Sequence, residues 1–219
     1  MTREANQMVL DGVEVIRSLR AVTSKYSKEE RAAFIATQSA LQEAVERVKV
    51  FELKLKEATA RVTLADDALD AGCRDLATAL AGEGFDRFNP FKGFGFEAPS
   101  EFTELKRVTQ ATAALSLVKR VAAHAETKAD SRKAAALVAT LAETTLEAES
   151  ARSDASLERT QAMVHRDKTL PREWQAALTA LRAAIRYGDL KEKTSHYTSV
   201  FSTLVKPRSQ KKKSSEPTS

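Results

Sequence analysis

The histidines and the single cysteine are the residues of this sequence best suited to catalysis or metal binding. His124, His165 and His196 lie far apart, and none has an acidic residue three positions away. Di-iron helical bundles need that Glu-x-x-His spacing on facing helices, and structural zinc sites need clustered cysteine and histidine ligands. Cys73 stands alone, which favours a small buried side chain over a reactive thiol. We therefore expect no metal and no cofactor.

Acidic clusters are the next candidates for acid–base chemistry. One group of carboxylates lies between Asp66 and Asp70, and another lies between Glu143 and Glu149. Arginines accompany both groups, and helix faces exposed to water commonly carry such pairs. The sequence has no Gly-x-Gly-x-x-Gly and no Gly-Lys-Ser/Thr phosphate loop. These patterns predict no catalytic residue, no small-molecule substrate and no enzyme activity.

A Phe-rich segment at residues 83–100 is the most unusual part of the sequence. A loop that joins two antiparallel helices usually needs only about two to eight residues. Two interpretations stay open. Either the rings fold back and cap the end of a helical hairpin, which we favour, or some stay exposed as an anchor for a partner protein or a membrane surface. Five of the nine phenylalanines lie in this segment: Phe85, Phe88, Phe91, Phe94 and Phe96.

Residues 206–219 form a basic tail that we expect to be disordered. Five basic residues stand there against one acidic residue, so the tail carries +4 of the net charge of +5. The rest of the chain is close to neutral, and its net charge gives no sign of a basic face for a nucleic-acid backbone. Nucleic-acid binding through the tail is therefore only a second alternative. The basic residues are Lys206, Arg208, Lys211, Lys212 and Lys213.

The composition indicates long helices. Alanine, leucine, glutamate, lysine and arginine make up just over half of the chain, as in coiled coils. Glycine and proline, which interrupt helices, are absent between Pro99 and Pro171, and Gly72 is the one interruption between Gly12 and Gly82. Gly82 is expected to end a helix in the left-handed conformation. This distribution predicts helices at about residues 3–22, 28–82, 101–168 and 172–205, all in one domain (1–205).

A seven-residue repeat runs through the second predicted helix. Large apolar residues recur at strict sevens, and a mostly small residue follows each of them three positions later. This alternation is typical of a seam along which neighbouring helices approach closely. The third predicted helix has a weaker repeat, whose register shifts after Ala129. The large residues of the seam are Phe34, Leu41, Val48, Leu55, Val62, Leu69 and Leu76.

These elements predict an all-α, coiled-coil-like fold, an elongated antiparallel hairpin of the two long helices. The two shorter helices return to the same end and complete a four-helix bundle there. The other end is then a two-helix arm, either bare or covered in part by the last helix. Because such an arm exposes alanine and leucine, we expect a protein partner or self-association, and we favour a homo-oligomer.

The expected function follows from this shape. We expect a non-enzymatic structural or scaffold protein, or a subunit of an assembly, that acts through its helical faces and the Phe-rich segment. The alternative is a membrane-associating helical protein, similar in outline to membrane remodellers or bundle toxins, that uses the same segment. No apolar leader, no stretch of about 18 apolar residues and no pair of cysteines is present. We therefore expect a cytoplasmic protein.

Overall fold

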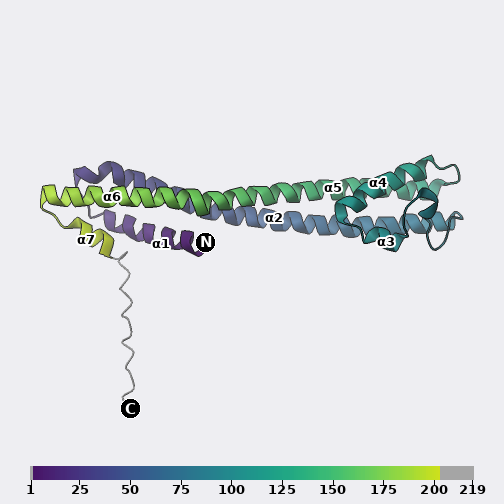
Figure 1. Cartoon of the computed structure of the whole chain (residues 1–219), viewed down its shortest axis with the longest axis horizontal. Coiled ribbons are helices and arrows are strands. Elements are labelled where there is room, and N and C mark those ends of the chain that lie inside the picture. The colour runs from purple at the N-terminus through teal and green to yellow at the C-terminus, as the bar shows by residue number, and fades with distance from the viewer. Residues whose placement is uncertain (1, 203–219) are drawn as a thin grey trace, which may run out of the picture. The chain divides into compact units, whose positions relative to one another are not determined.

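A computed structural model of the chain describes residues 2–202. Within that range all regular structure is helical and no β-strand occurs, so the predicted all-α fold is confirmed (Figure 1). Three short turns, η1 (Lys25–Ser27), η2 (Lys92–Phe94) and the π-helical η3 (His165–Thr169), lie between or within the helices. The α-helices are α1 (Thr2–Leu19), α2 (Lys28–Gly82), α3 (Pro99–Thr103), α4 (Arg107–Ala123), α5 (Ala129–Val164), α6 (Leu170–Glu192) and α7 (His196–Phe201).

The chain divides into two compact units. Unit 1 combines residues 1–48 with residues 162–219, and unit 2 comprises residues 49–161. Helices α2 and α5 contribute residues to both units. Each unit has a hydrophobic core of its own.

Unit 1 is built from α1, the first part of α2, α6 and α7. Their apolar stripes meet in one core, where the rings of Phe34 and Trp174 pack 5.6 Å apart. Gln38 is the polar centre of this core and is only 1% exposed. Its Nε2 donates to the carbonyl of Val9 in α1, and its Oε1 accepts a hydrogen bond from Trp174 Nε1 in α6. The predicted packing of the first and last helices against the long helices is therefore confirmed.

In unit 2, α2 and α5 run antiparallel. Arg159, late in α5, forms an ion pair with Glu52 at 3.4 Å. Thr145, earlier in α5, donates from Oγ1 to the carbonyl of Ala65, which lies further along α2. The helices approach closely at Gly72, where an added Cβ would lie 2.7 Å from a leucine side chain of α5. The small residue at this seam position therefore sets the distance between the two helices.

The heptad seam of α2 points into the two cores. Six of its seven large residues are buried, and Leu55 is half-buried. Leu55 lies in the part of unit 2 where α2 and α5 bury few side chains. The six buried residues are Phe34, Leu41 and Val48 in unit 1, and Val62, Leu69 and Leu76 in unit 2.

Residues 101–168 do not form the single helix that the sequence predicts. They form α3, α4 and most of α5, with turns at residues 104–106 and 124–128. The second turn uses neither glycine nor proline. Thr127 Oγ1 lies 2.8 Å from the carbonyl of Val121 and 2.7 Å from that of His124. A side-chain hydroxyl thus satisfies carbonyl groups that the end of α4 leaves free, and the helix can stop there.

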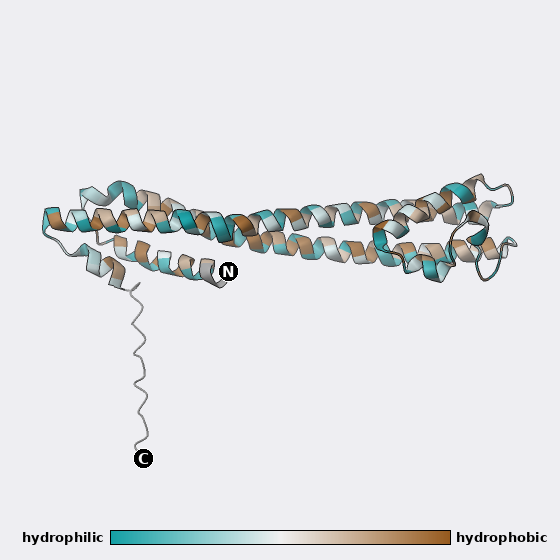
Figure 2. Ribbon diagram, in the orientation of Figure 1, coloured by the Kyte–Doolittle hydropathy of each residue, from teal (hydrophilic) through white to brown (hydrophobic). Residues whose placement is uncertain are grey.

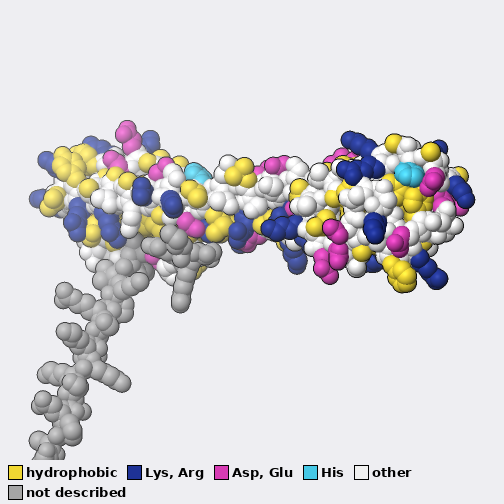
Figure 3. Space-filling model, turned by 45° about the vertical axis from the view of Figure 1, so that its right-hand side comes forward, with side chains coloured by type: hydrophobic (Ala, Val, Ile, Leu, Met, Phe, Trp, Pro, Cys, Tyr) yellow, Lys and Arg dark blue, Asp and Glu magenta, His cyan; other side chains and the backbone are white. Residues whose placement is uncertain are grey.

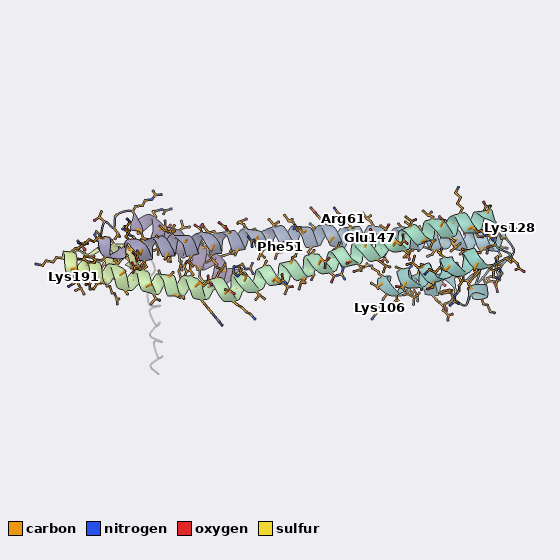
Figure 4. The ribbon with its side chains drawn as sticks, turned by 90° about the horizontal axis from the view of Figure 1, so that it is seen from above. Phe51, Arg61, Lys106, Lys128, Glu147 and Lys191 are labelled. Carbon is orange, nitrogen blue, oxygen red and sulfur yellow. The ribbon has the colours of Figure 1, made fainter. Side chains whose placement is uncertain are left out.

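Helix α4 packs against α2 and α5 as a third helix of unit 2. Arg107 Nε pairs with Asp66 of α2 at 2.8 Å, and Gln110 Nε2 donates to Asp70 at 2.6 Å. Figure 4 labels Lys106 at the start of this helix. Where α4 lies, the expectation of a bare two-helix arm is wrong.

The last predicted helix, residues 172–205, also has different bounds. No break precedes it, because α5 continues through η3 into α6, and Pro171, which has no N–H to donate, lies in the first turn of α6. Helix α6 ends where Lys193 adopts a φ of 55°. Asp189 then caps α7, since its carboxylate accepts two backbone hydrogen bonds of 2.9 and 2.7 Å from the start of that helix.

Hydrophobic residues are spaced at intervals along the long helices and alternate with polar ones (Figure 2). Among the helices formed by residues 2–202, none combines the length and the apolarity needed to cross a bilayer. The apolar positions instead follow the helical repeat that faces the cores.

Candidate functional site in the Phe-rich segment

The Phe-rich segment begins with a closed end of α2. The N–H of Gly84 donates to the carbonyl of Ala81, and the N–H of Phe85 donates to that of Leu80, both at 3.2 Å. This pair of bonds forms a Schellman motif, which needs a left-handed residue, and Gly84 supplies it with a φ of 103°. The expectation that Gly82 takes this position is wrong, because α2 continues through Gly82.

Glu83 fixes the segment to the start of α5. Its carboxylate accepts hydrogen bonds from the N–H groups of Lys128 (2.7 Å) and Ser131 (2.9 Å) and from the Ser131 hydroxyl (2.6 Å). Both N–H groups are donors that a helix N-terminus leaves free, so Glu83 caps α5 from the end of another helix. Partial desolvation raises the pKa of Glu83, but the hydrogen bonds from Lys128 and Ser131 outweigh it and hold the pKa below its usual value.

Most rings of the segment close the end of the unit 2 core. Phe91 and Phe94 are buried, and Phe85 and Phe96 are half-buried against the same core. Phe91 packs edge-on against Phe102 of α3, with the ring centres 5.6 Å apart. Burial of one such side chain stabilises a fold by roughly 1.5–3 kcal/mol. These four rings therefore act as a cap on the helical hairpin.

Arg120 of α4 holds the segment from the side. Its Nη1 donates to the carbonyl of Phe94 at 2.6 Å, and its guanidinium lies over the ring of Phe96, 4.9 Å from the centre. Gly95 stands between these two contacts with a φ of 77°, and a Cβ there would lie 2.9 Å from Arg120 Nη1. Glycine is therefore favoured at this position for its left-handed conformation, and a larger residue would also displace the end of the Arg120 side chain.

Phe88 differs from the other rings because it is 90% exposed, more than any other large hydrophobic residue that the structure describes. A fixed turn carries it. Asp86 Oδ1 accepts hydrogen bonds from the N–H groups of Phe88 (2.8 Å) and Asn89 (3.1 Å), and the next residues, Pro90 and Phe91, are buried. The N–H groups of Asn89 and Phe88 also lower the pKa of Asp86. The segment thus presents one aromatic ring to solvent on a well-defined backbone.

Charged residues flank Phe88 in the segment. Asp86, Arg87 and Lys92 are all exposed. Figure 3 shows charged side chains mixed with hydrophobic ones, in yellow, over the right-hand end of unit 2. An exposed ring with a polar rim resembles the anchor residue of a protein interface.

The structure divides the five phenylalanines between the two interpretations of the segment. Four lie where the cap interpretation places them, and Phe88 is exposed, as the anchor interpretation requires of at least one ring. Sequence reasoning missed the three residues that hold the turn, Glu83, Asp86 and Arg120. Asp86, two residues before Phe88, was a usable signal for a turn of this kind. The other two act on groups far away in sequence, for which the chain carries no local signal.

The basic tail, residues 206–219, lies outside the described residues. The five basic residues named for it, Lys206, Arg208, Lys211, Lys212 and Lys213, therefore have no structural assignment. Nucleic-acid binding through them stays a prediction.

The other candidate chemical groups are not brought together. Within residues 2–202, no group of three or more His, Cys, Asp or Glu side chains is arranged to hold a metal ion. Cys73 is buried, and desolvation, with a smaller effect of nearby Asp70, raises its pKa to about 12. His124 packs edge-on against the rings of Phe85 and Phe94, at 5.5 and 5.3 Å.

Comparison of the chain with protein-family models, with curated proteins and with solved structures finds no match. What the protein does must therefore be inferred from its own residues and their arrangement.

Proposed function

We propose that the protein is a non-enzymatic scaffold or assembly subunit whose Phe-rich segment binds a protein partner through Phe88. The observation that carries the proposal is the contrast between Phe88, which is 90% exposed, and Phe91, which is fully buried three residues later. Large aromatic side chains are among the residues that contribute most to protein interfaces. Among the described residues, Phe88 makes none of the ring contacts that bind its neighbours to the core.

The fixed turn supports this proposal because it lowers the cost of binding. Ordering a mobile side chain at an interface costs about 0.5–1.5 kcal/mol, and ordering the backbone of a loop adds to that cost. In this segment Asp86 holds the turn on one side of Phe88, and Arg120 holds the backbone at Phe94. A partner would therefore meet a backbone that is already in place, and only the side chain of Phe88 would have to be ordered.

The rim indicates the chemistry of the partner. Arg87 and Lys92 are basic and Asp86 is acidic, so the surroundings of Phe88 carry a local charge of +1. A matching surface has an apolar pocket for one ring and an excess of acidic side chains around it.

Photo-crosslinking tests this proposal. p-Benzoylphenylalanine would replace Phe88 in one variant and Leu105, an exposed apolar residue of the same unit, in a control variant. Both would be irradiated in extracts of the source cells. We expect a covalent adduct of defined mass with a second protein from position 88 and not from position 105. Equal adducts from both positions, or no adduct from position 88, would count against the proposal.

Membrane association is the second candidate function, and the basic residues beside Phe88 are the observation that favours it. Arg87 and Lys92 would face anionic headgroups if the ring entered the bilayer interface. One buried ring contributes roughly 1.5–3 kcal/mol, which gives weak binding by itself. We therefore rank a membrane below a protein partner. Flotation with anionic liposomes decides between them, because Phe88→Ser should abolish binding if the ring inserts.

Nucleic-acid binding by the tail is the third candidate. It would depend on phosphate contacts of the five basic tail residues and would weaken steeply with salt. Deletion of residues 206–219 should abolish it. Binding that survives the deletion would exclude the tail as its cause.

A further inference from the structure

In unit 2, α4 covers one side of the α2–α5 pair from Asp66 towards the Phe-rich segment and leaves the opposite side open. The covered side is marked by Arg107, which contacts Asp66 on α2 and Glu149 on α5. The opposite side, called the open face below, contains a groove of about 350 Å³ between α2 and α5. Its lining includes Lys54, Ala58 and Arg61 from α2 and Ala151, Asp154 and Glu158 from α5.

The core beneath the open face is thin. From residue 49 to residue 61, α2 buries no side chain, and from residue 146 to residue 161, α5 buries only Ala155. Val50, Leu64 and Leu137, whose helical positions place them along the open face, are 53%, 69% and 52% exposed. Because helices in proteins are stabilised mainly by packing of an apolar face, these segments need further cover.

The two helices of the open face carry opposite charge. Among the charged residues that line the groove, α2 contributes Lys54, Glu57 and Arg61, net +1. From the other side of the groove, α5 contributes Asp154 and Glu158, net −2. Lys54 and Glu158 already pair across the groove at 3.7 Å within one chain. The surface is therefore self-complementary, since its positive half matches the negative half of a second copy.

Arg61 of α2 and Glu147 and Asp154 of α5 are charged residues of this face that form no ion pair with another described residue. Figure 4 shows Arg61 and Glu147 in the same stretch of unit 2. The pairs Glu52–Arg159 and Lys54–Glu158 set the antiparallel register. In that register Arg61 lies level with the part of α5 between Glu147 and Asp154.

We propose that the open face is a homodimer interface, in which α2 of each copy packs on α5 of the other about a twofold axis parallel to the helices. This axis places α2 of one copy against α5 of the other copy, with no shift along the helices. The positive half of one face then meets the negative half of the other. Arg61 of one copy then lies within a helical turn of Glu147 and Asp154 of the other. An axis across the helices would place α2 on α2 and bring like charges together.

The size of the face suits a stable dimer. From Val50 to Gly72 it is about 33 Å long at 1.5 Å per residue, and two adjacent helices are about 20 Å wide. The product, roughly 650 Å² per copy, is close to the ~800 Å² per partner of standard interfaces. Alanines along the groove, such as Ala58 and Ala151, let helices of two copies approach closely. This interface is separate from Phe88 and does not depend on the function proposed for it.

Sedimentation equilibrium of the full chain with charge variants tests the proposal. We expect the wild type to approach twice its mass of 24.0 kDa as concentration rises. Arg61→Glu should weaken the dimer at least tenfold. Adding both Glu147→Arg and Asp154→Arg to the Arg61→Glu variant should restore the dimer. Lys56→Glu is the matched control, because Lys56 is exposed and lines a different groove, with Leu55 and Thr63; it should leave the dimer unchanged.

Three results would overturn the proposal. One is a wild type that stays monomeric at about 100 µM. Another is an equal loss of dimer in Arg61→Glu and Lys56→Glu. The third is a triple variant that is helical by circular dichroism but remains monomeric.

Discussion

Ser131 donates two hydrogen bonds to Glu83, a residue 48 positions earlier in the chain, from its hydroxyl at 2.6 Å and from its N–H at 2.9 Å. The contact joins the end of α2 to the start of α5. The turn that carries Phe88 begins at Asp86, three residues after Glu83, so this contact holds the chain close to the start of the turn.

The stability of unit 2 should depend on the ionisation of Glu83. The folded state lowers the pKa of Glu83 below its ordinary value of 4.5. The carboxylate therefore stabilises the fold fully above about pH 4.5, and this stabilisation is lost as the pH falls through the lower folded pKa. Glu83→Gln should lower the free energy of unfolding at pH 7 by about 1 kcal/mol, the usual effect of losing a helix cap. Urea unfolding at pH 7 and at pH 3.5 measures the difference, which should shrink at the lower pH.

Glu126→Gln is the control for this experiment. Glu126 lies in the same turn before α5, and its side chain makes no hydrogen bond or ion pair with another described residue. It should unfold like the wild type at both pH values. A Glu83→Gln variant as stable as Glu126→Gln at pH 7 would refute the capping role.

Truncation of Phe91 should lower the stability of the protein far more than truncation of Phe88. Phe91→Ala removes a ring that is fully buried in the unit 2 core and should destabilise the protein by about 3–5 kcal/mol. Phe88→Ala removes an exposed ring and should change stability by less than about 0.5 kcal/mol. Thermal and urea unfolding followed by circular dichroism compare the two variants. Similar losses of stability would mean that Phe88 belongs to the core.

Cys73 should be unreactive in the folded protein. It is buried, and its pKa of about 12 leaves roughly one thiol in ten thousand ionised at pH 8. Labelling with a thiol reagent should therefore be slow and should follow the opening of unit 2. Ala71→Cys in a Cys73→Ala background is the control, because Ala71 is exposed on the same helix and should label at once. Equal labelling rates would contradict the described core.

Gln38 should stabilise unit 1 through its two buried hydrogen bonds. Gln38→Leu leaves the buried N–H of Trp174 without its partner, removes the side-chain hydrogen bond to the carbonyl of Val9, and should cost about 1–3 kcal/mol. Trp174 is the only tryptophan, so its fluorescence reports the unfolding of unit 1. Gln175→Leu, at an exposed position of α6, should leave that transition unchanged. A Gln38→Leu transition that coincides with that of the control would show that the bonds are dispensable.

The long helices could be predicted from sequence because their pattern is local. The repeat from Phe34 to Leu76 requires one buried side of a helix, and the scarcity of glycine and proline allows long helices without interruption. The turn between α4 and α5 could not be predicted in this way. Thr127 ends α4 with a hydroxyl, and Glu83, 45 residues before Lys128, caps α5. The shift of the heptad register near Ala129 was the one local sequence signal at the position of that turn.

The candidate site was predictable as a segment and not as a residue. Phe85, Phe88, Phe91 and Phe94 recur at every third position, and this spacing does not distinguish Phe88 from Phe91. Their environments differ because Asp86 turns the backbone at one of them and the core of unit 2 receives the other. That difference depends on tertiary packing, which no short window of sequence contains.

Measuring the affinity of the crosslinked partner for the wild type and for Phe88→Ala tests the central claim most directly. Titration calorimetry would compare the wild type with Phe88→Ala, whose fold is expected to be intact. An anchor residue of this kind contributes about 2 kcal/mol or more, so the variant should bind roughly 30-fold more weakly or worse. Equal affinity of the wild type and Phe88→Ala would contradict the claim that the Phe-rich segment binds through this ring.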